Sequence, residues 1–284
     1  MEIVNTAATL DQKAEGLRQV LAGSGRLIVA YSGGVDSAFL AWMAHQVLGS
    51  QMRAVIADSA SLARTHLEDA LAFARQQGIP VEVVETQELE NPAYARNDAM
   101  RCFHCKDELF TVLERYREAC GFDAIAYGVN ADDQGDFRPG QQAARQHHVL
   151  APLLQAGLNK AEIRELARRA DLRVWDKPAS ACLSSRLEYG RPVTPEALSA
   201  IERGEDALRA MGFRQFRVRH HGEIVRIEIA RDELPHALTA EMARELTTVF
   251  KGLGFKFVTL DLEGFRSGSM NQLLTAEELL RGNT

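Results

Sequence analysis

The chain has 284 residues, a length that predicts one large domain or two smaller ones with a substantial buried core. Hydrophobic residues make up 46% of it and charged residues 25%, as in an ordinary globular enzyme. The formal net charge of -6 argues against a broad nucleic-acid-binding surface, because proteins that grip phosphate backbones usually carry a basic face.

The first residues of the chain, 1–12, include Glu2 and Asp11 and contain no long apolar run. We therefore predict neither a secretory signal nor a membrane-spanning helix, and we expect a cytoplasmic protein without a membrane partner. In a reducing compartment, four cysteines are more typical of thiols or metal ligands than of disulfides.

Short apolar runs alternate with amphipathic stretches through the first half of the chain. The apolar runs predict buried strands at residues 26–31, 54–57, 81–84 and 124–127. The amphipathic stretches predict helices at residues 10–22, 37–48, 62–77 and 107–119. This alternation predicts an α/β, Rossmann-like domain with a parallel sheet and right-handed crossovers.

The pattern changes after Trp175. Residues 176–192 form a predicted loop rich in Ser, Ala and Pro. The elements predicted beyond it are a helix at 195–211, a two-stranded ribbon at 216–220 and 224–229, a helix at 241–252 and a strand at 255–262. Strands that pair locally, with helices on one side, predict a small α+β domain. We place the domains at residues 1–190 and 191–284.

A phosphate-binding loop is predicted directly after the first strand, at Ser32-Gly33-Gly34-Val35-Asp36-Ser37. Gly33 and Gly34 let backbone N–H groups approach a phosphate, and the following helix adds the positive end of its dipole. Ser32 and Ser37 supply hydroxyl donors, and Asp36 can hold Mg²⁺. A capped tight turn is the alternative, but the full string favours nucleotide binding. It is not a Walker A loop, because the Gly-Lys-Ser/Thr ending is absent.

Three cysteines form the second constellation. Cys102 and Cys105 are a C-x-x-C pair, and Cys182 lies in a loop of small residues. Two thiolates at this spacing can bind the same soft metal ion, and a third cysteine can complete a set of three ligands. Zinc would need a histidine as its fourth ligand, for which His104 and His66 are candidates. A cubane iron–sulfur cluster with three cysteine ligands would instead leave one iron without a protein ligand. A redox dithiol and small buried hydrophobes are the alternatives, and we expect the fourth cysteine to be a buried hydrophobe.

The loop at residues 32–37 resembles the PP-loop of the ATP-pyrophosphatase superfamily, whose members adenylate a substrate oxygen and release pyrophosphate. The resemblance implies an adenine-binding strand end, for which Ala57 and Asp58 are correctly placed after the second strand. It also implies an ATP-binding role for Arg138, in a polar segment that follows the strand at 124–127. Ligands in open α/β sheets bind at such strand ends.

Further motifs extend over nearly the whole chain. They are Cys102-x-x-Cys105, Arg138-Pro139-Gly140, the loop from Ser180 to Arg186 with Tyr189-Gly190, Arg217-Val218-Arg219-His220, and Gly264-Phe265-Arg266-Ser267-Gly268-x-Met270-Asn271. Together with the PP-loop they resemble the LarE family, ATP-dependent sulfur transferases that help to make the nickel-pincer nucleotide cofactor of lactate racemase.

The resemblance implies the substrate pyridinium-3,5-biscarboxylic acid mononucleotide. ATP would adenylate each carboxylate, and sulfur would displace AMP to leave a thiocarboxylate. Some family members sacrifice one cysteine as the sulfur donor, whereas others carry three cysteines that hold a [4Fe-4S] cluster. This chain has the three-cysteine pattern, so the resemblance implies Cys102, Cys105 and Cys182 as cluster ligands. Sacrifice of Cys182 is the alternative.

The resemblance also implies roles for individual side chains. The residues expected to be catalytic are Asp36, Cys182, Ser185 and Arg186. The residues expected to bind substrate are Arg217, Arg219, Glu205 and Glu228. Arg217 and Arg219 alternate along a strand, so both guanidinium groups can grip one phosphate. An exposed strand with surface carboxylates is the ordinary alternative.

Two other functions compete with sulfur transfer to a mononucleotide. A tRNA thiolation enzyme can also combine a PP-loop with three cysteines, but it predicts a basic face, and the net charge is -6. A nucleotide-binding regulator is the second alternative, but it would not account for the three cysteines and the arginines. The family implies a sulfide source, a homo-oligomer and other cofactor-biosynthesis enzymes as partners, and no nucleic acid.

Overall fold

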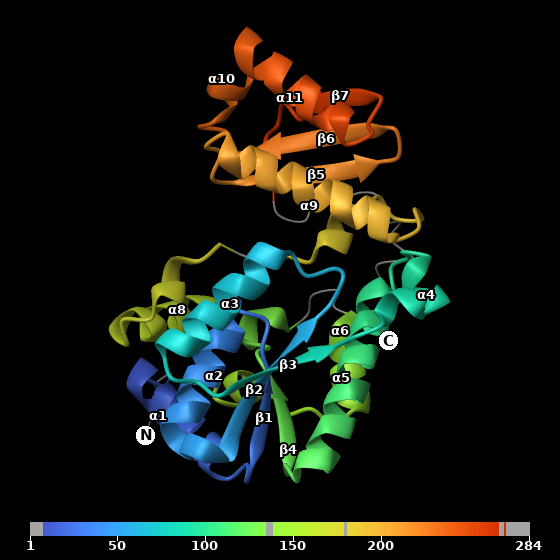
Figure 1. Cartoon of the computed structure of the whole chain (residues 1–284). Coiled ribbons are helices and arrows are strands. Elements are labelled where there is room, and N and C mark those ends of the chain that lie inside the picture. Colours follow the sequence, from blue (N-terminus) through green and yellow to red (C-terminus); the bar gives the residue numbers. More distant parts are fainter. Residues whose placement is uncertain (1–7, 135–138, 179–180, 267–269, 271–284) are drawn as a thin grey trace, which may run out of the picture. The chain divides into compact units, whose positions relative to one another are not determined.

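The computed structural model of the chain describes residues 8–134, 139–178, 181–266 and 270 (Figure 1). Two sheets organise it, a parallel sheet of four strands and a smaller sheet of three. The predicted α/β class with a smaller α+β part is therefore confirmed. Among the described residues, no helix is both long and apolar enough to cross a membrane.

The larger sheet has the strand order β3-β2-β1-β4, and every neighbouring pair is parallel. Its strands are β1 (Leu27–Ala30), β2 (Met52–Asp58), β3 (Val81–Glu85) and β4 (Ala124–Tyr127). The centre of the run that predicted β1 is fully buried, with Leu27, Ile28 and Val29 at 0% exposure. The strand order reverses between β1 and β4, and ligand sites in such sheets lie at this reversal.

Helices cover both faces of the larger sheet. They are α1 (Leu10–Ala22), α2 (Val35–Leu48), α3 (Arg64–Gln76), α5 (Arg101–Cys120), α6 (Pro139–Gln146), α7 (Pro152–Gln155) and α8 (Lys160–Arg169). Right-handed crossovers place α2 and α3 on one face, and the return from β3 to β4 places α5 on the other (Figure 1). Helices α6 to α8 were not predicted.

The start of α5 differs from the prediction, which placed it near residue 107. The helix begins at Arg101, so Cys102 and Cys105 lie in its first turns. Just before the helix, the Asp98 carboxylate accepts a hydrogen bond from the Met100 N–H at 2.8 Å, which closes a local turn. The first turn is polar, and apolar periodicity therefore could not reveal it.

The smaller sheet has the order β5-β6-β7. Its strands are β5 (Phe216–His221), β6 (Ile224–Ile229) and β7 (Phe257–Leu260), and its helices are α9 (Pro195–Ala210), α10 (Leu234–Ala237) and α11 (Ala240–Gly252). Strands β5 and β6 form the predicted hairpin, whereas β7 pairs with β6 in parallel after a crossover through α11. Val225, Ile227 and Ile229 of β6 are fully buried.

Contacts within the chain divide it into two units. The first unit comprises residues 1–59, 64–87 and 105–180, and the second comprises 60–63, 88–104 and 181–284. The second unit thus includes α4 (Pro92–Ala95) and the loop before residue 190. Backbone hydrogen bonds explain this, since Gly190 N–H donates to the Asn97 carbonyl at 3.0 Å. The two domains predicted from the sequence, divided near residue 190, stay a prediction.

Candidate functional site: a phosphate loop and a cysteine–arginine centre

The PP-loop joins β1 to α2 in the first unit. Gly33 has φ +71°, and a Cβ there would lie 2.6 Å from the Cβ of Ala70, so only glycine fits. Gly34 caps α2 without a side-chain hydrogen bond, which leaves the first N–H groups of the helix open to a ligand. The Ser32 and Ser37 hydroxyl oxygens lie 3.1 Å apart. The loop therefore has the donors and the backbone shape of an anion cradle.

Asp36 lies in the first turn of α2 with its two carboxylate oxygens in different environments. Oδ2 forms an ion pair with Lys160 Nζ. Oδ1 is buried and has no hydrogen-bond partner among the described residues. A buried carboxylate oxygen without a partner is costly, and Mg²⁺ prefers such ligands. The donor thus fits the predicted metal.

Lys160 is a residue that the sequence analysis missed. It is the first residue of α8, and its backbone N–H donates to Asp132 Oδ2 at 2.9 Å. A lysine in the first turn of a helix opposes the helix dipole. This unfavourable position, directly after the capping residue Asn159, was the signal available in the sequence.

The residues predicted to bind the rest of ATP are only partly described. Ala57 and Asp58 end β2, at the carboxyl edge of the sheet that also carries the PP-loop. The Asp58 carboxylate pairs with Arg64 at 2.5 Å. Arg138 lies outside the described residues. The adenine-binding role of the β2 end stays a prediction.

Cys182 lies in the second unit, directly before a short 3-10 turn at Leu183–Arg186. Its sulfur is 3.1 Å from the Ser184 hydroxyl, and its carbonyl accepts from the Ser185 hydroxyl at 2.7 Å and from Arg186 Nη1 at 2.8 Å. The structure therefore brings Cys182, Ser185 and Arg186 together, and their role in sulfur transfer stays a prediction.

The surroundings of Cys182 favour its thiolate. Burial raises the pKa of the thiol, but the charge of Arg101, the Ser184 hydroxyl and the charge of Arg186 lower it by more, so the net pKa lies below the ordinary value. A thiolate is the form that binds metals and delivers sulfur.

The other cysteines differ in exposure. Cys102 is exposed and Cys105 half-buried, one turn apart on α5. Cys120 is exposed, so its predicted burial as a small hydrophobe is wrong. It ends α5, whose last three residues are exposed. In the described parts of the chain, no three His, Cys, Asp or Glu side chains are arranged to hold a metal ion. The three-cysteine ligand set therefore stays a prediction.

Glu205 and Glu228 are not surface carboxylates, because they are 5% and 0% exposed. Glu205 forms a bidentate ion pair with Arg186, at 2.9 and 3.2 Å, and it also accepts a hydrogen bond from the Val218 N–H. Glu228 pairs with Arg219 at 2.9 Å, and Arg219 is itself only 6% exposed. The alternative of an exposed strand with ordinary surface charges is therefore wrong.

Arg217 adds a further cation to this cluster. Burial lowers the pKa of Arg217 to about 10, helped by the charges of Arg186 and Arg219. Its guanidinium lies 5.0 Å from the centre of the Phe265 ring. Crowded, partly buried arginines are stabilised by an anion, so the cluster has the electrostatics of a phosphate or carboxylate site.

The Arg186–Glu205 pair yields a stability prediction. Replacing Glu205 by glutamine leaves the Arg186 side chain, 1% exposed, without its counter-charge. We expect the free energy of unfolding to fall by about 3–5 kcal/mol in urea titrations followed by circular dichroism. Asp206→Asn is the matched control, because the neighbouring Asp206–Arg209 pair is about half exposed and should contribute at most about 1 kcal/mol. Equal losses in the two variants would refute the buried pair.

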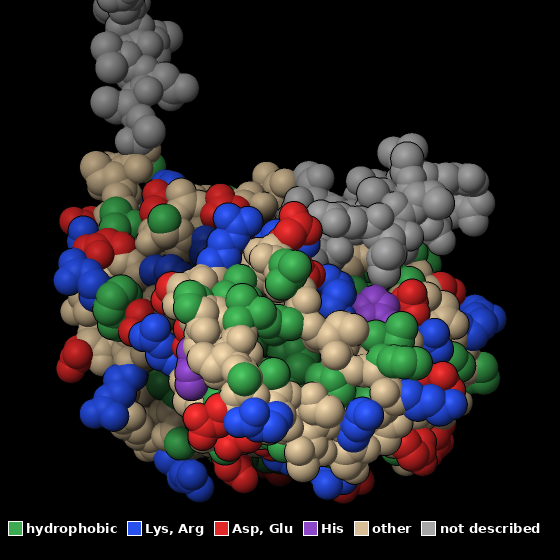
Figure 2. All heavy atoms as spheres, turned by 90° about the horizontal axis from the view of Figure 1, so that it is seen from above, with side chains coloured by type: hydrophobic (Ala, Val, Ile, Leu, Met, Phe, Trp, Pro, Cys, Tyr) green, Lys and Arg blue, Asp and Glu red, His purple; other side chains and the backbone are tan. Residues whose placement is uncertain are grey.

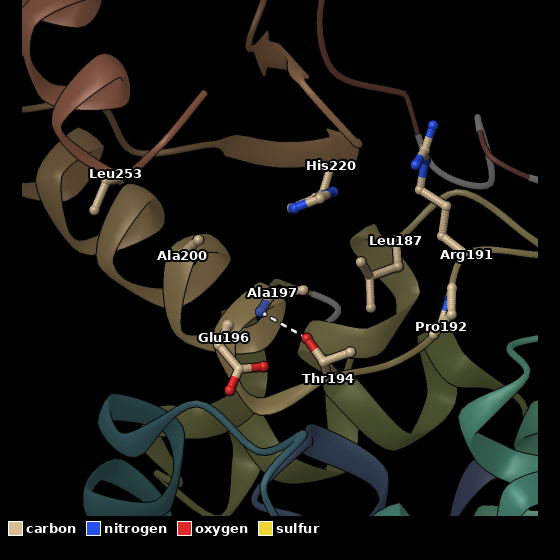
Figure 3. A pocket seen from close by; sticks show the side chains of 9 residues that line it. All are labelled: Leu187, Arg191, Pro192, Thr194, Glu196, Ala197, Ala200, His220 and Leu253. Carbon is tan, nitrogen blue, oxygen red and sulfur yellow. Dashed lines mark hydrogen bonds between the residues drawn. The ribbon is translucent and has the colours of Figure 1, made fainter. Parts of the chain in front are cut away.

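Two hollows lie within the second unit, and neither contains a predicted site residue. The larger, of about 360 Å³, lies among residues of α9, β5 and the segment before α9, with Leu187, Ala200 and the His220 ring around it (Figure 3). The smaller, of about 160 Å³, lies between α11 and β7. In the view from above, hydrophobic side chains gather near the middle of the face (Figure 2).

Similarity to known proteins extends over nearly the whole chain. It is 42% identical to the uncharacterized protein slr1717 of Synechocystis sp., over 94% of this chain and 99% of that protein. It is 33% identical to the pyridinium-3,5-bisthiocarboxylic acid mononucleotide synthase of Lactiplantibacillus plantarum, over 96% of this chain and 98% of that protein. It is 28% identical to the uncharacterized protein MJ0830 of Methanocaldococcus jannaschii, over 85% of this chain and 91% of that protein. Residues 10–116 match the NAD synthase family model.

Proposed function

Because the chain belongs to the PP-loop family of the pyridinium-3,5-bisthiocarboxylic acid mononucleotide synthase, we propose that it is an ATP-dependent sulfur transferase acting on a pyridinium mononucleotide with two carboxylates. The product would be the bisthiocarboxylate, a precursor of a nickel-pincer nucleotide. The relationship over 96% of the chain supports the substrate class. The buried, unpartnered Oδ1 of Asp36 is the observation that carries the ATP step.

The first step consumes ATP. A carboxylate oxygen of the substrate attacks the α-phosphorus, the bond to the bridging oxygen breaks, and pyrophosphate leaves. The open N–H groups after Gly34 hold phosphate oxygens, and the Ser32 and Ser37 hydroxyls donate to them. Asp36 would hold Mg²⁺, which neutralises charge on the departing pyrophosphate. Lys160, now paired with Asp36, is a second cation at this end of the loop.

The second step exchanges oxygen for sulfur. Hydrosulfide attacks the acyl carbon of the adenylate, AMP leaves with the original carboxylate oxygen, and a proton is released. Arg217 and Arg219 would hold the phosphate of the mononucleotide, and the Cys182 loop would present the sulfur. Cys102, Cys105 and Cys182 would hold a [4Fe-4S] cluster, which would supply an iron site for sulfide. Sacrifice of Cys182 is the alternative sulfur route.

AMP and pyrophosphate formation tests the proposed reaction. With ATP, Mg²⁺, sulfide and the mononucleotide, both products should appear in equal amounts, and omission of the mononucleotide should stop them. Formation of ADP and phosphate instead would contradict the assignment. Iron content and the visible spectrum of anaerobically purified protein decide between cluster-bound sulfide and a sacrificed cysteine.

Arg217→Ala should weaken binding of the mononucleotide by about tenfold or more, because a charged hydrogen bond to phosphate is worth about 1.5–3 kcal/mol. ATP affinity should stay the same. Arg219→Ala should have a similar effect on binding and also lower stability, since Glu228 loses a partner. Calorimetric titration measures both ligands.

Arg214→Ala is the control for this prediction, because Arg214 is 80% exposed. It should bind both ligands like the wild type. A loss of ATP affinity in Arg217→Ala equal to its loss of mononucleotide affinity would assign this arginine to another site.

A further inference from the structure

Arg101 is a buried cation that the predicted site does not include. It is 4% exposed, and its Nη1 donates to Asn97 Oδ1 at 2.5 Å and to the Ser184 carbonyl at 2.9 Å. Its guanidinium lies 5.5 Å from the centre of the Tyr189 ring. All four residues belong to the second unit, so one compact unit holds this arrangement.

Asn97 fixes the position of Arg101. It is 0% exposed and has φ +57°, a left-handed conformation that costs energy in a residue other than glycine. Its side-chain amide donates to the Glu188 carbonyl at 2.8 Å, and its own carbonyl accepts from Gly190 N–H. These bonds hold the strained backbone in place, so Arg101 has a firm support.

The fixed guanidinium is close enough to interact electrostatically with two thiols from distant parts of the chain. Arg101 interacts electrostatically with Cys102, its neighbour on α5, and with Cys182. It also bonds the carbonyl of Ser184, whose hydroxyl is 3.1 Å from the Cys182 sulfur. The position of the Cys182 loop therefore depends on Arg101.

Within the described part of the chain, the charge of Arg101 is not balanced by a carboxylate. Among the residues that the structure describes, no Asp or Glu forms an ion pair with it, whereas the equally buried Arg186 has Glu205. Buried charges in proteins are normally paired. The acidic groups that interact with its charge are the thiols of Cys102 and Cys182 and the phenols of Tyr189 and Tyr94. Of these, thiols ionise more readily than phenols.

We propose that Arg101 is the positioning residue of the sulfur centre. It holds the Cys182 loop against the start of α5, and it supplies the positive charge that balances an anionic sulfur species at the two thiols. The reaction that the sulfur centre serves rests on the proposed function. The charge and the position of Arg101 have the same effect whether Cys182 is a cluster ligand or a sacrificed thiol. A buried arginine that only braces the backbone is the competing explanation.

The local charge can be measured with two alkylating reagents of similar size. Iodoacetate is anionic and iodoacetamide is neutral, so the ratio of their rates at one cysteine reports the local potential and cancels accessibility and thiolate fraction. The full-length protein purified in air is used, and peptide mass spectrometry gives the rate at each cysteine. In the wild type, the ratio at Cys182 should exceed that at the exposed Cys120 by about tenfold.

Variants of Arg101 separate charge from bracing. Arg101→Met should lower the ratio at Cys182 toward the Cys120 value, leaving the smaller effect of the Arg186 charge, and Arg101→Lys should keep most of the ratio. Arg209→Met, a half-exposed arginine of the same unit, is the matched control and should change nothing. If Arg101 only braces the loop, Arg101→Met speeds both reagents alike and leaves the ratio unchanged, which overturns the proposal.

The wild-type comparison can still overturn the proposal if Arg101→Met does not fold. Equal ratios at Cys182 and Cys120 would overturn the proposal without any variant. The assay needs neither substrate nor turnover. A raised ratio in a protein that transfers no sulfur would therefore contradict the proposed function alone, and a normal ratio in an active sulfur transferase would contradict only the role of Arg101.

Discussion

Pyrophosphate release should fall by about 100-fold or more when Asp36 is replaced by asparagine, because the developing charge on pyrophosphate loses its metal-binding oxygen. The change keeps the size of the side chain but removes the charge that pairs with Lys160. The measurement is the initial rate of pyrophosphate formation at saturating ATP, Mg²⁺ and mononucleotide.

Asp11→Asn is the matched control for Asp36. Asp11 is a highly exposed aspartate of the same unit, whose side chain is 86% accessible, and its variant should keep the wild-type rate. Circular dichroism should show an unchanged fold for both. A wild-type rate in Asp36→Asn would remove the PP-loop assignment, since no other described residue offers a buried, unpartnered carboxylate oxygen there.

Cys182→Ala should abolish thiocarboxylate formation under either sulfur route. It removes a cluster ligand in the first route and the sulfur donor itself in the second. The first unit, which holds the PP-loop, is untouched, so a single burst of pyrophosphate should remain as the acyl-adenylate accumulates. Quenched-flow measurement of pyrophosphate and mass spectrometry of the substrate test the two halves separately.

Cys120→Ala controls for loss of a thiol, since Cys120 is exposed at the far end of α5 and should be dispensable. Thiocarboxylate formation by Cys182→Ala at the wild-type rate would contradict the role of Cys182. Mass spectrometry of the wild-type protein after turnover separates the routes. Loss of the mass of hydrogen sulfide at Cys182 alone would mean that the cysteine is sacrificed.

Local sequence determines the phosphate loop, and this part of the site could be predicted. A buried apolar strand, two glycines and a helix that starts without a side-chain cap are all encoded within residues 27–37. The positive φ of Gly33 follows from the same string. The parallel pairing of β7 with β6 is different, because it depends on a crossover through α11 and not on neighbouring residues.

Long-range ion pairs explain most of what the sequence left open. Lys160 reaches Asp36 across 124 positions, and no local pattern reveals such a contact. Glu205 and Glu228 are residue types that usually lie at the surface, and only their arginine partners allow burial. The relation of Arg101 to Cys182 likewise requires the fold, although Arg101 and Cys102 are adjacent in the chain.

The most direct measurement of the proposed reaction follows the carboxylate oxygen. The mononucleotide is labelled with ¹⁸O in both carboxylates and incubated with the protein, ATP, Mg²⁺ and sulfide, and AMP and the pyridinium product are then analysed by mass spectrometry. An acyl-adenylate route places one ¹⁸O in AMP for each oxygen of the substrate that sulfur replaces. AMP without ¹⁸O, or a substrate whose oxygens all remain, would contradict ATP-dependent sulfur transfer by this chain.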